Sequence, residues 1–225
     1  IWRCNSCSKT ISIRKDTFLE KCHLTVFTLF QIIADFISEL PVTCSMSWNN
    51  ISNDTAIQWY EYCREICSVM LLKDKKKLGG LNHTVQVDES LLFKKKYEVG
   101  RMVDKFWVIG FYDVTQKNGY LQHITDRKAE TLEAAIIENK LGYIHGTVNH
   151  SQNFVDPVSG VCTNSVEAFW SRIKRRLKYK SGSCGNMKWS HIDEAMYRDY
   201  YDMKCENSWE NFQTFIKHIA EIYPQ

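Results

Sequence analysis

The sequence of 225 residues lacks any long hydrophobic run. No stretch of about 18 residues is both apolar and free of charge, so no membrane-spanning helix is predicted. The sequence also lacks a strong excess of one charge: its formal net charge is +3, so any surface for an acidic partner has to be local. A hydrophobic fraction of 44% with 13% aromatic residues argues against disorder and predicts a packed core.

No secretory signal segment opens the chain, and its nine cysteines are an odd number. A secreted disulfide framework is therefore not expected. We expect a reducing compartment, in which some cysteines bind zinc and others are buried, among them Cys63 and Cys67 at helical spacing. Because the sequence begins at Ile1 rather than Met, we expect it to be part of a longer product.

The N-terminal third has the pattern of helices. Apolar residues at three- and four-residue spacing predict an amphipathic helix over 24–40, which ends at Pro41. Ser52 is expected to cap a second helix over 53–72. The two helices are a candidate helix-turn-helix, although about a dozen residues separate them, more than the usual tight turn. The lysine- and glycine-containing segment 74–80 predicts a linker.

After the linker the pattern changes to that of strands, followed by helices. Strands are predicted over Thr84–Phe93, Phe106–Val114 and Gly119–Ile124, with a hairpin turn at Lys117-Asn118-Gly119. The later elements predicted are a helix over 129–140, a strand over 143–149, a basic helix over 164–180, and helices over 190–204 and 208–222. Three strands, a helix, a strand and a helix is the order of an RNase H-like domain, so the predicted fold class is α/β with a central mixed sheet.

Two carboxylates form a candidate site. Asp88 lies inside the first predicted strand, and Glu167 lies near the start of the basic helix. Each has an ordinary explanation, because Asp88 can face solvent on an alternating strand and Glu167 can form a capping box with Asn164. In an RNase H-like sheet, however, the first strand and a late helix meet. Phosphodiester cleavage uses two Mg²⁺ ions about 4 Å apart, held by convergent carboxylates, so the pair is a candidate catalytic site.

Six of the ten residues from 171 to 180 are basic. They are Arg172, Lys174, Arg175, Arg176, Lys178 and Lys180. A solvated helix face is the ordinary explanation, but these residues share a helix with Glu167, which favours DNA contact. Each phosphate that they neutralise would steepen the salt dependence of binding by roughly one unit of log–log slope.

Cys4 and Cys7 have the spacing of a zinc knuckle, and Ile11 and Ile13 after them predict a short strand. Structural zinc has four ligands, so this pair is half of a site. The other half lies either upstream of this sequence or, as the alternative, at Cys22 and His23.

Three segments carry a resemblance to a known family: VDES at 87–90, YEVGRMVDKFWVIGFYD at 97–113, and LGYIHGTVNHSQNFVDPVSGVCTNSVEAFWSRIKRR at 141–176. They resemble the Merlin superfamily of eukaryotic transposons and its bacterial insertion-sequence relatives. The resemblance covers most of residues 84–180, and the VNHS to TNSVE block is its most specific part. It implies a DDE transposase with an RNase H-like core.

The resemblance also implies roles for individual residues. Asp88 matches the first catalytic aspartate of the family, Glu167 the terminal glutamate, and Lys174 a basic residue that faces the DNA end. Mg²⁺ or Mn²⁺ is the implied cofactor at Asp88 and Glu167. The segment around Cys4 and Cys7 resembles the second half of the family's zinc ribbon, which favours an upstream partner knuckle for Zn²⁺. The implied partner is the double-stranded DNA of transposon terminal inverted repeats, bound in the nucleus by a homodimer.

The sequence departs from the family at the second catalytic aspartate. In the family, a strand bearing it precedes the LGY segment, whereas here the predicted helix 129–140 runs directly into Leu141. The remaining candidates, none of which lies where the family has its carboxylate, are Asp104, Asp113, Asp126 and Asp156. Two carboxylates can bind one Mg²⁺ weakly, as an ion that keeps most of its waters. We therefore expect the chain to be inactive, or nearly so, as a transposase.

The predicted domains are a partial zinc ribbon over 1–20, a helical region with the candidate helix-turn-helix over 21–76, an RNase H-like domain over 82–205 and a C-terminal helix over 206–225. The expected function is that of a transposase-derived protein, which binds transposon-end DNA and whose ancestor catalysed metal-dependent strand cleavage and transfer. One alternative is a host-adopted, non-catalytic DNA-binding protein. The other is a zinc-ribbon interaction module with an unrelated α/β domain.

Overall fold

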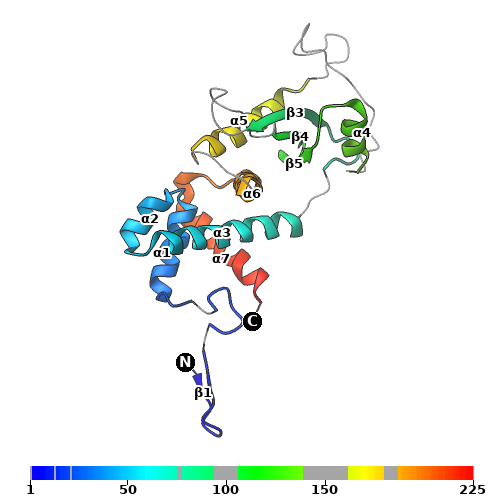
Figure 1. The fold of residues 1–225 in the computed structure, drawn as a ribbon. Helices are drawn as coiled ribbons and strands as arrows, with labels where there is room; N and C mark the ends of the chain where they lie inside the picture. Colours follow the sequence, from blue (N-terminus) through cyan, green and yellow to red (C-terminus); the bar gives the residue numbers. More distant parts are fainter. Residues whose placement is uncertain are drawn as a thin grey trace. The chain divides into compact units, whose positions relative to one another are not determined.

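The computed structural model describes residues 2–12, 14–20, 22–74, 78–93, 106–138, 162–179 and 187–224 (Figure 1). The chain forms two compact units, one made of Ile1–Asp74 with Trp189–Gln225 and one made of Lys75–Lys188. We call them the helical unit and the α/β unit. Across the described residues the protein is mixed α/β, as predicted, with helices and two small antiparallel sheets.

The helical unit is made of residues from both the N-terminal and the C-terminal parts of the chain. Its elements are α1 (Val26–Ile37), α2 (Val42–Asn49), α3 (Asn53–Lys73), most of α6 (Met187–Tyr200), a 3₁₀ turn (Cys205–Asn207) and α7 (Ser208–Ile222). The sequence pattern had assigned 190–205 to the α/β domain and 206–225 to a separate helix. In the structure, Tyr197, Met203 and Phe215 from these segments belong to the same buried core as α1 and α3.

Local signals explain where the helices of this unit begin. The predicted cap at Ser52 is confirmed, because its hydroxyl accepts a hydrogen bond from the Thr55 N–H at 3.2 Å. Thr25 caps α1 in the same way through the Thr28 N–H at 3.1 Å. Helix α2 was not predicted. It lies in the connection between α1 and α3, which is longer than the tight turn of a helix-turn-helix.

A buried arginine, paired with Glu194 within α6, ties α6 to α1. Arg198 donates to the carbonyl oxygens of Phe36 and Ile37 at 2.6 and 2.9 Å, and to the Glu194 carboxylate at 2.9 Å. The last carbonyls of a helix lack partners within the helix and carry its negative dipole end, so a guanidinium suits this position. Arg198 and Glu194 are both almost fully buried, at 2% and 1% exposed.

An N-terminal hairpin precedes α1. Strands β1 (Trp2–Arg3) and β2 (Thr10–Ile11) pair antiparallel, with Trp2 opposite Ile11 and Arg3 opposite Thr10. This confirms a short strand after the Cys4–Cys7 pair.

The α/β unit is built on a three-stranded antiparallel sheet. Its strands are β3 (Val85–Phe93), β4 (Phe106–Asp113) and β5 (Asn118–Ile124), in the order β3-β4-β5. Each lies within one residue of its prediction at either end, and Lys117 takes a positive φ of 56° in the predicted turn. Helices α4 (Ala129–Glu138) and α5 (Asn164–Tyr179) also match their predictions. The strand predicted over 143–149 lies outside the described residues.

The two helices of this unit cover opposite faces of the sheet. Side chains alternate between faces along a strand. Val85 and Val87 point to the face on which Ile109, Phe111 and Ala135 of α4 form a buried cluster. The intervening residues of β3 point to the other face, where α5 contacts β3 and β4. The candidate residue Asp88 is one of these.

Candidate functional site on β3 and α5

Gln86 fastens the start of α5 to strand β3. Its side-chain oxygen accepts hydrogen bonds from the backbone N–H groups of Ser165 and Val166, at 2.7 and 3.0 Å. The first N–H groups of a helix have no partner within the helix, so a strand residue here supplies what a cap residue usually supplies. The Gln86 side chain is buried and also contacts Cys162 Sγ at 3.5 Å.

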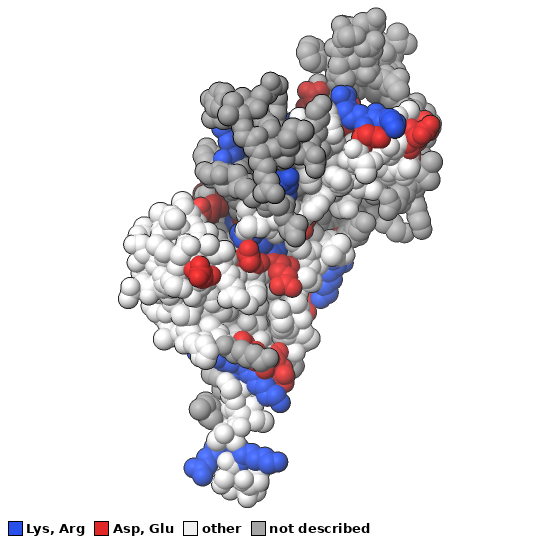
Figure 2. Space-filling model, in the orientation of Figure 1, with Lys and Arg blue, Asp and Glu red and all other residues white. Residues whose placement is uncertain are grey.

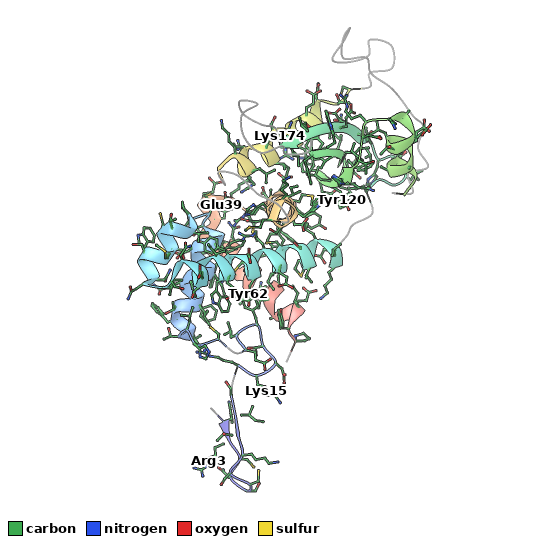
Figure 3. All side chains as sticks on the ribbon, in the orientation of Figure 1. Arg3, Lys15, Glu39, Tyr62, Tyr120 and Lys174 are labelled. Atoms are coloured by element: carbon green, nitrogen blue, oxygen red, sulfur yellow. The ribbon has the colours of Figure 1, made fainter. Side chains whose placement is uncertain are left out.

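A second hydrogen bond joins the same two elements further along. Lys174 Nζ donates to Ser90 Oγ at 2.6 Å (Figure 3). The four residues from Gln86 to Ser90 span about 13 Å of strand. The nine residues from Ser165 to Lys174 span about 13 Å of helix. The helix therefore runs along β3 in the same direction, in a register fixed at both ends.

Asp88 lies midway between these two attachments and on the same face of β3. The helix residue at the corresponding midpoint is Trp170. Gly110, which pairs with Asp88 across the β3–β4 ladder, makes room for it, since a Cβ on Gly110 would come within 2.5 Å of the Trp170 ring. Gly119 makes the same room for Phe169, at 2.7 Å. Both glycines allow α5 to approach the sheet closely.

Glu167 and Lys174 lie about one helical turn to either side of Trp170, and so on the same stripe of α5. Glu167 is half-buried, and its Oε1 accepts a hydrogen bond from the Thr163 hydroxyl at 3.0 Å. Burial lowers the pKa of Lys174, and the negative charge of Asp88 partly opposes that shift. The three candidate residues predicted from sequence thus lie along one seam between β3 and α5.

The seam contains one buried donor without a partner. The Trp170 indole Nε1 is buried and has no hydrogen-bond partner among the described residues. Such a group costs about 1–3 kcal/mol relative to one that is satisfied. This indole ring lies against Gly110, the cross-strand partner of Asp88. The unsatisfied donor is therefore part of the candidate site.

The described residues do not complete a two-metal centre. No three His, Cys, Asp or Glu side chains gather among them in a way that could hold a metal ion. The Asp113 carboxylate accepts from His83, from the Gly79 N–H and from two further backbone N–H groups. Asp126 accepts from the Lys128 N–H and the Thr131 hydroxyl at the start of α4. Asp104 and Asp156, the other candidates for the second aspartate, lie outside the described residues.

The predicted basic residues differ in their surroundings. The Arg172 guanidinium lies over the Tyr112 and Phe169 rings, at 5.6 and 5.7 Å from their centroids. Arg175 and Lys178 are exposed, whereas Arg176 is half-buried. Lys180 lies outside the described residues. Helix α5 therefore presents two exposed cations, Arg175 beside the stripe that faces β3 and Lys178 one turn after Lys174 along it.

The predicted zinc ligands Cys4 and Cys7 are both exposed on the N-terminal hairpin. Hydrogen bonds from the Ser6 hydroxyl, from backbone N–H groups and from the Cys7 thiol lower the pKa of Cys4 to about 6. The thiolate is the form that binds zinc, so the pair suits half of a tetrahedral site.

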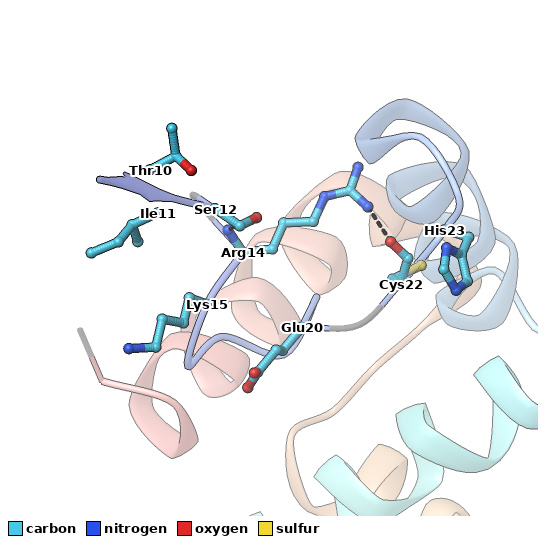
Figure 4. Close-up of a pocket in the computed structure, with 8 residues that line it drawn as sticks. All are labelled: Thr10, Ile11, Ser12, Arg14, Lys15, Glu20, Cys22 and His23. Carbon is cyan, nitrogen blue, oxygen red and sulfur yellow. Dashed lines mark hydrogen bonds between the residues drawn. The ribbon is translucent and has the colours of Figure 1, made fainter. Parts of the chain in front are cut away.

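The alternative ligands Cys22 and His23 line a pocket of about 560 Å³ (Figure 4). Arg14 and Lys15 line the same pocket, and Arg14 donates to the Cys22 carbonyl at 2.6 Å. Two cations beside these ligands, against the one carboxylate of Glu20 in the pocket, disfavour a Zn²⁺ ion. The pocket is therefore a poor second half for the zinc site. Cys63 and Cys67 are fully buried, as predicted.

Sequence reasoning missed Gln86, Ser90, Gly110 and Trp170 as parts of the site. The available signal was the two-residue spacing of Gln86, Asp88 and Ser90, which sets three polar side chains on one face of an apolar strand.

The fold and the site define a mixed α/β protein in which a basic helix is fastened along the first strand of an antiparallel sheet. Comparisons of the chain with protein-family models, with curated proteins and with solved structures give no match. No helix within the described residues has the length and apolar character needed to cross a membrane.

Proposed function

We propose that the chain is a transposase-derived protein that binds double-stranded DNA through α5 and does not cut it. The observation that carries the proposal is the fixed register of α5 on β3. Gln86 and Ser90 hold the helix at two points, so that Glu167 and Lys174 share one seam with Asp88. A sheet with a helix on each face, together with this seam, supports an RNase H-like ancestry for the α/β unit.

The charge of α5 supports DNA as the partner. Between Asn164 and Tyr179 the helix has five basic residues and one acidic residue. Arg175 and Lys178 are exposed and available to phosphate groups. Sequence-independent DNA affinity comes largely from such contacts. The ancestral targets would be transposon terminal inverted repeats, and the protein would act in the nucleus.

Binding without cleavage is proposed because the described part of the seam has only two of the candidate carboxylates, Asp88 and Glu167. Asp88 and Glu167 would hold at most one Mg²⁺ or Mn²⁺ ion, with water as its other ligands. The charge of Asp88 already interacts with the Lys174 ammonium group. Two-metal catalysis needs a larger set of convergent acidic ligands than these two residues provide. Cys4 and Cys7 would supply half of a structural Zn²⁺ site.

The test of DNA binding is fluorescence anisotropy with a random-sequence duplex of about 30 base pairs over a range of KCl concentrations. Arg175→Glu with Lys178→Glu should weaken binding at least tenfold and lower the salt slope by about two units. The matched control, Lys9→Glu with Lys217→Glu, makes the same change in net charge away from α5 and should have a much smaller effect. No binding by the unmodified chain, or equal losses in the two variants, would disprove the proposal.

The test of catalysis uses supercoiled plasmid with Mg²⁺ or Mn²⁺. We expect no nicking above the level of Asp88→Ala and Glu167→Ala. Cleavage by the unmodified chain that both substitutions abolish would show an active transposase and refute the non-catalytic part of the proposal. The DNA-binding part of the proposal would still be tested separately by the anisotropy experiment.

A further inference from the structure

Four aromatic side chains form an apolar surface on the helical unit. Phe27 and Phe30 lie one turn apart on α1 and are 72% and 41% exposed, and Trp209 on α7 is 65% exposed. Phe212 connects them, because its ring lies 6.2 Å from that of Phe30 and is stacked on Trp209 at 5.9 Å. We call these four residues the α1–α7 aromatic face.

Nucleic acid is a poor partner for this part of the molecule. The sequence from Cys22 to Cys63 contains no lysine or arginine, and its acidic residues are Asp35, Glu39, Asp54 and Glu61. The surface over α1 and α2 is mostly uncoloured in Figure 2, where blue marks Lys and Arg. DNA binding depends on neutralising phosphate charge, so the helix-turn-helix hypothesis lacks electrostatic support over the segment from Cys22 to Cys63.

We propose that the α1–α7 aromatic face is a dimer interface, and that its occupant is the same face of a second copy of this chain. In a two-fold interface, the residues near the axis meet their own counterparts. A charged face would there oppose like charges, whereas an aromatic face without formal charge can meet itself at no such cost. The four residues of the face carry no charge.

The exposed area of the face is sufficient for a small stable interface. An aromatic side chain buries roughly 200 Å², so the exposed fractions of Phe27, Phe30 and Trp209 leave on the order of 350 Å² per copy. Two copies would remove about 700 Å² of aromatic surface from water. Interfaces of standard size bury about 1,200–2,000 Å² in total, of which somewhat more than half is apolar. The face therefore matches the lower end of that range.

The inference does not depend on the proposed DNA binding. The resemblance noted above implied a homodimer but gave no surface for it, and the face follows from exposure and ring contacts alone. Its test also uses no DNA, so that either proposal can fail without the other.

The experiment is sedimentation velocity on the full chain from about 1 to 100 µM. The unmodified protein, of 26.4 kDa per chain, should pass from monomer to dimer over this range. Phe27→Asp and Trp209→Asp should each weaken the dimer at least tenfold, because each places like charges opposite one another. Leu72→Asp is the matched control, since Leu72 is 73% exposed on α3 outside the face, and it should leave the dimer unchanged.

Several results would overturn the proposal. They are a chain that stays monomeric at 100 µM, a dimer that persists in Phe27→Asp and Trp209→Asp, and equal weakening by Leu72→Asp. Circular dichroism of each variant checks that it is folded. Should Phe27→Asp fail to fold, Phe27→Ser and Trp209→Ser provide the same test with smaller expected shifts.

Discussion

The two units use charge in opposite ways. The helical unit buries Arg198 against Glu194 and has no lysine or arginine between Cys22 and Cys63. The α/β unit instead turns exposed cations outward on α5 and holds the helix with neutral polar groups at Gln86 and Ser90. The buried charge of the first unit serves its own packing, whereas the exposed charge of α5 in the second is available to a partner.

The two units also differ in how closely their helices and strands pack against one another. In the helical unit, aromatic rings separate the helices, with Phe36 and Tyr60 in an edge contact at 5.5 Å and Phe36 and Phe215 at 5.7 Å. In the α/β unit, Gly110 and Gly119 bring the backbone of the sheet directly against α5. The stability of the helical unit should therefore depend on contacts between buried side chains. The stability of the α/β unit should depend on the space that Gly110 and Gly119 leave for α5.

The largest effect is expected at Arg198 in the helical unit. Arg198→Met removes the cation that pairs with the buried Glu194, together with the side-chain donor to the Phe36 and Ile37 carbonyls of α1. Breaking a buried ion pair in this way costs about 3–5 kcal/mol of unfolding free energy. Urea denaturation followed by circular dichroism measures it.

The control for this change is Lys73→Met. Lys73 pairs with Glu221 at 2.7 Å, and both side chains are nearly half exposed. Exposed pairs contribute about 0–1 kcal/mol. A loss at Arg198 no greater than the loss at Lys73 would show that Arg198 does not hold α6 to α1.

The second effect concerns the clearance between α5 and the sheet. Gly110→Ala should destabilise the α/β unit by about 1–3 kcal/mol, the usual cost of overpacking, because its Cβ meets the Trp170 ring at 2.5 Å. The same change made in a Trp170→Leu background should cost less, since the smaller side chain leaves space. Equal costs in the two backgrounds would mean that Trp170 is not the obstacle.

The third effect tests the attachment of α5 by Gln86. Gln86→Ala leaves the Ser165 and Val166 N–H groups without their acceptor, at a cost of about 1–3 kcal/mol. Hydrogen exchange of these two amides should accelerate, while exchange in the helical unit stays the same. Gln86→Glu keeps an accepting oxygen and should restore much of the protection. Unchanged exchange in Gln86→Ala would exclude the attachment.

The sequence predicted the elements of the α/β unit well because their patterns are local. Alternation defines β3, and the Lys117-Asn118-Gly119 turn fixes the start of β5. Helix α2 was missed because only Ser45 among its residues is buried, so no amphipathic stripe marks it. Its apolar residues do not repeat at helical spacing, and Pro41 before it looks like a helix end.

The site was predictable only in part, for a related reason. Asp88, Glu167 and Lys174 were found because chemistry and a family resemblance pointed to them. Gln86 makes its contacts with residues 79 and 80 positions away. Nothing in the local pattern of β3 specifies those partners. The grouping of α6 with the N-terminal helices is equally non-local, since Arg198 reaches carbonyls more than 160 positions earlier.

The smallest predicted effect is a difference between the two units in how their stability depends on pH. Burial lowers the pKa of His218 below its ordinary value of 6.5, although Asp74 and Glu221 oppose the shift. A lowered pKa in the folded state means that this group stabilises the fold above about pH 6.5, and that the stabilisation is lost as the pH falls through the folded-state pKa. Burial raises the pKa of Asp113, but hydrogen bonds from His83, Gln116 and Gly79 outweigh it and leave the pKa below 3.8.

The helical unit should therefore weaken as the pH falls below about 6.5, while the Asp113 contribution to the α/β unit persists until the pH falls below about 4. Hydrogen exchange, corrected for the intrinsic rate, should show faster exchange in α7 at pH 5 than at pH 7 and little change in β4. His218→Gln should remove the change in α7, because a glutamine does not titrate. A pH response in α7 that survives this substitution would assign it to another group, and an equal response in β4 would mean that the two units do not differ in this way.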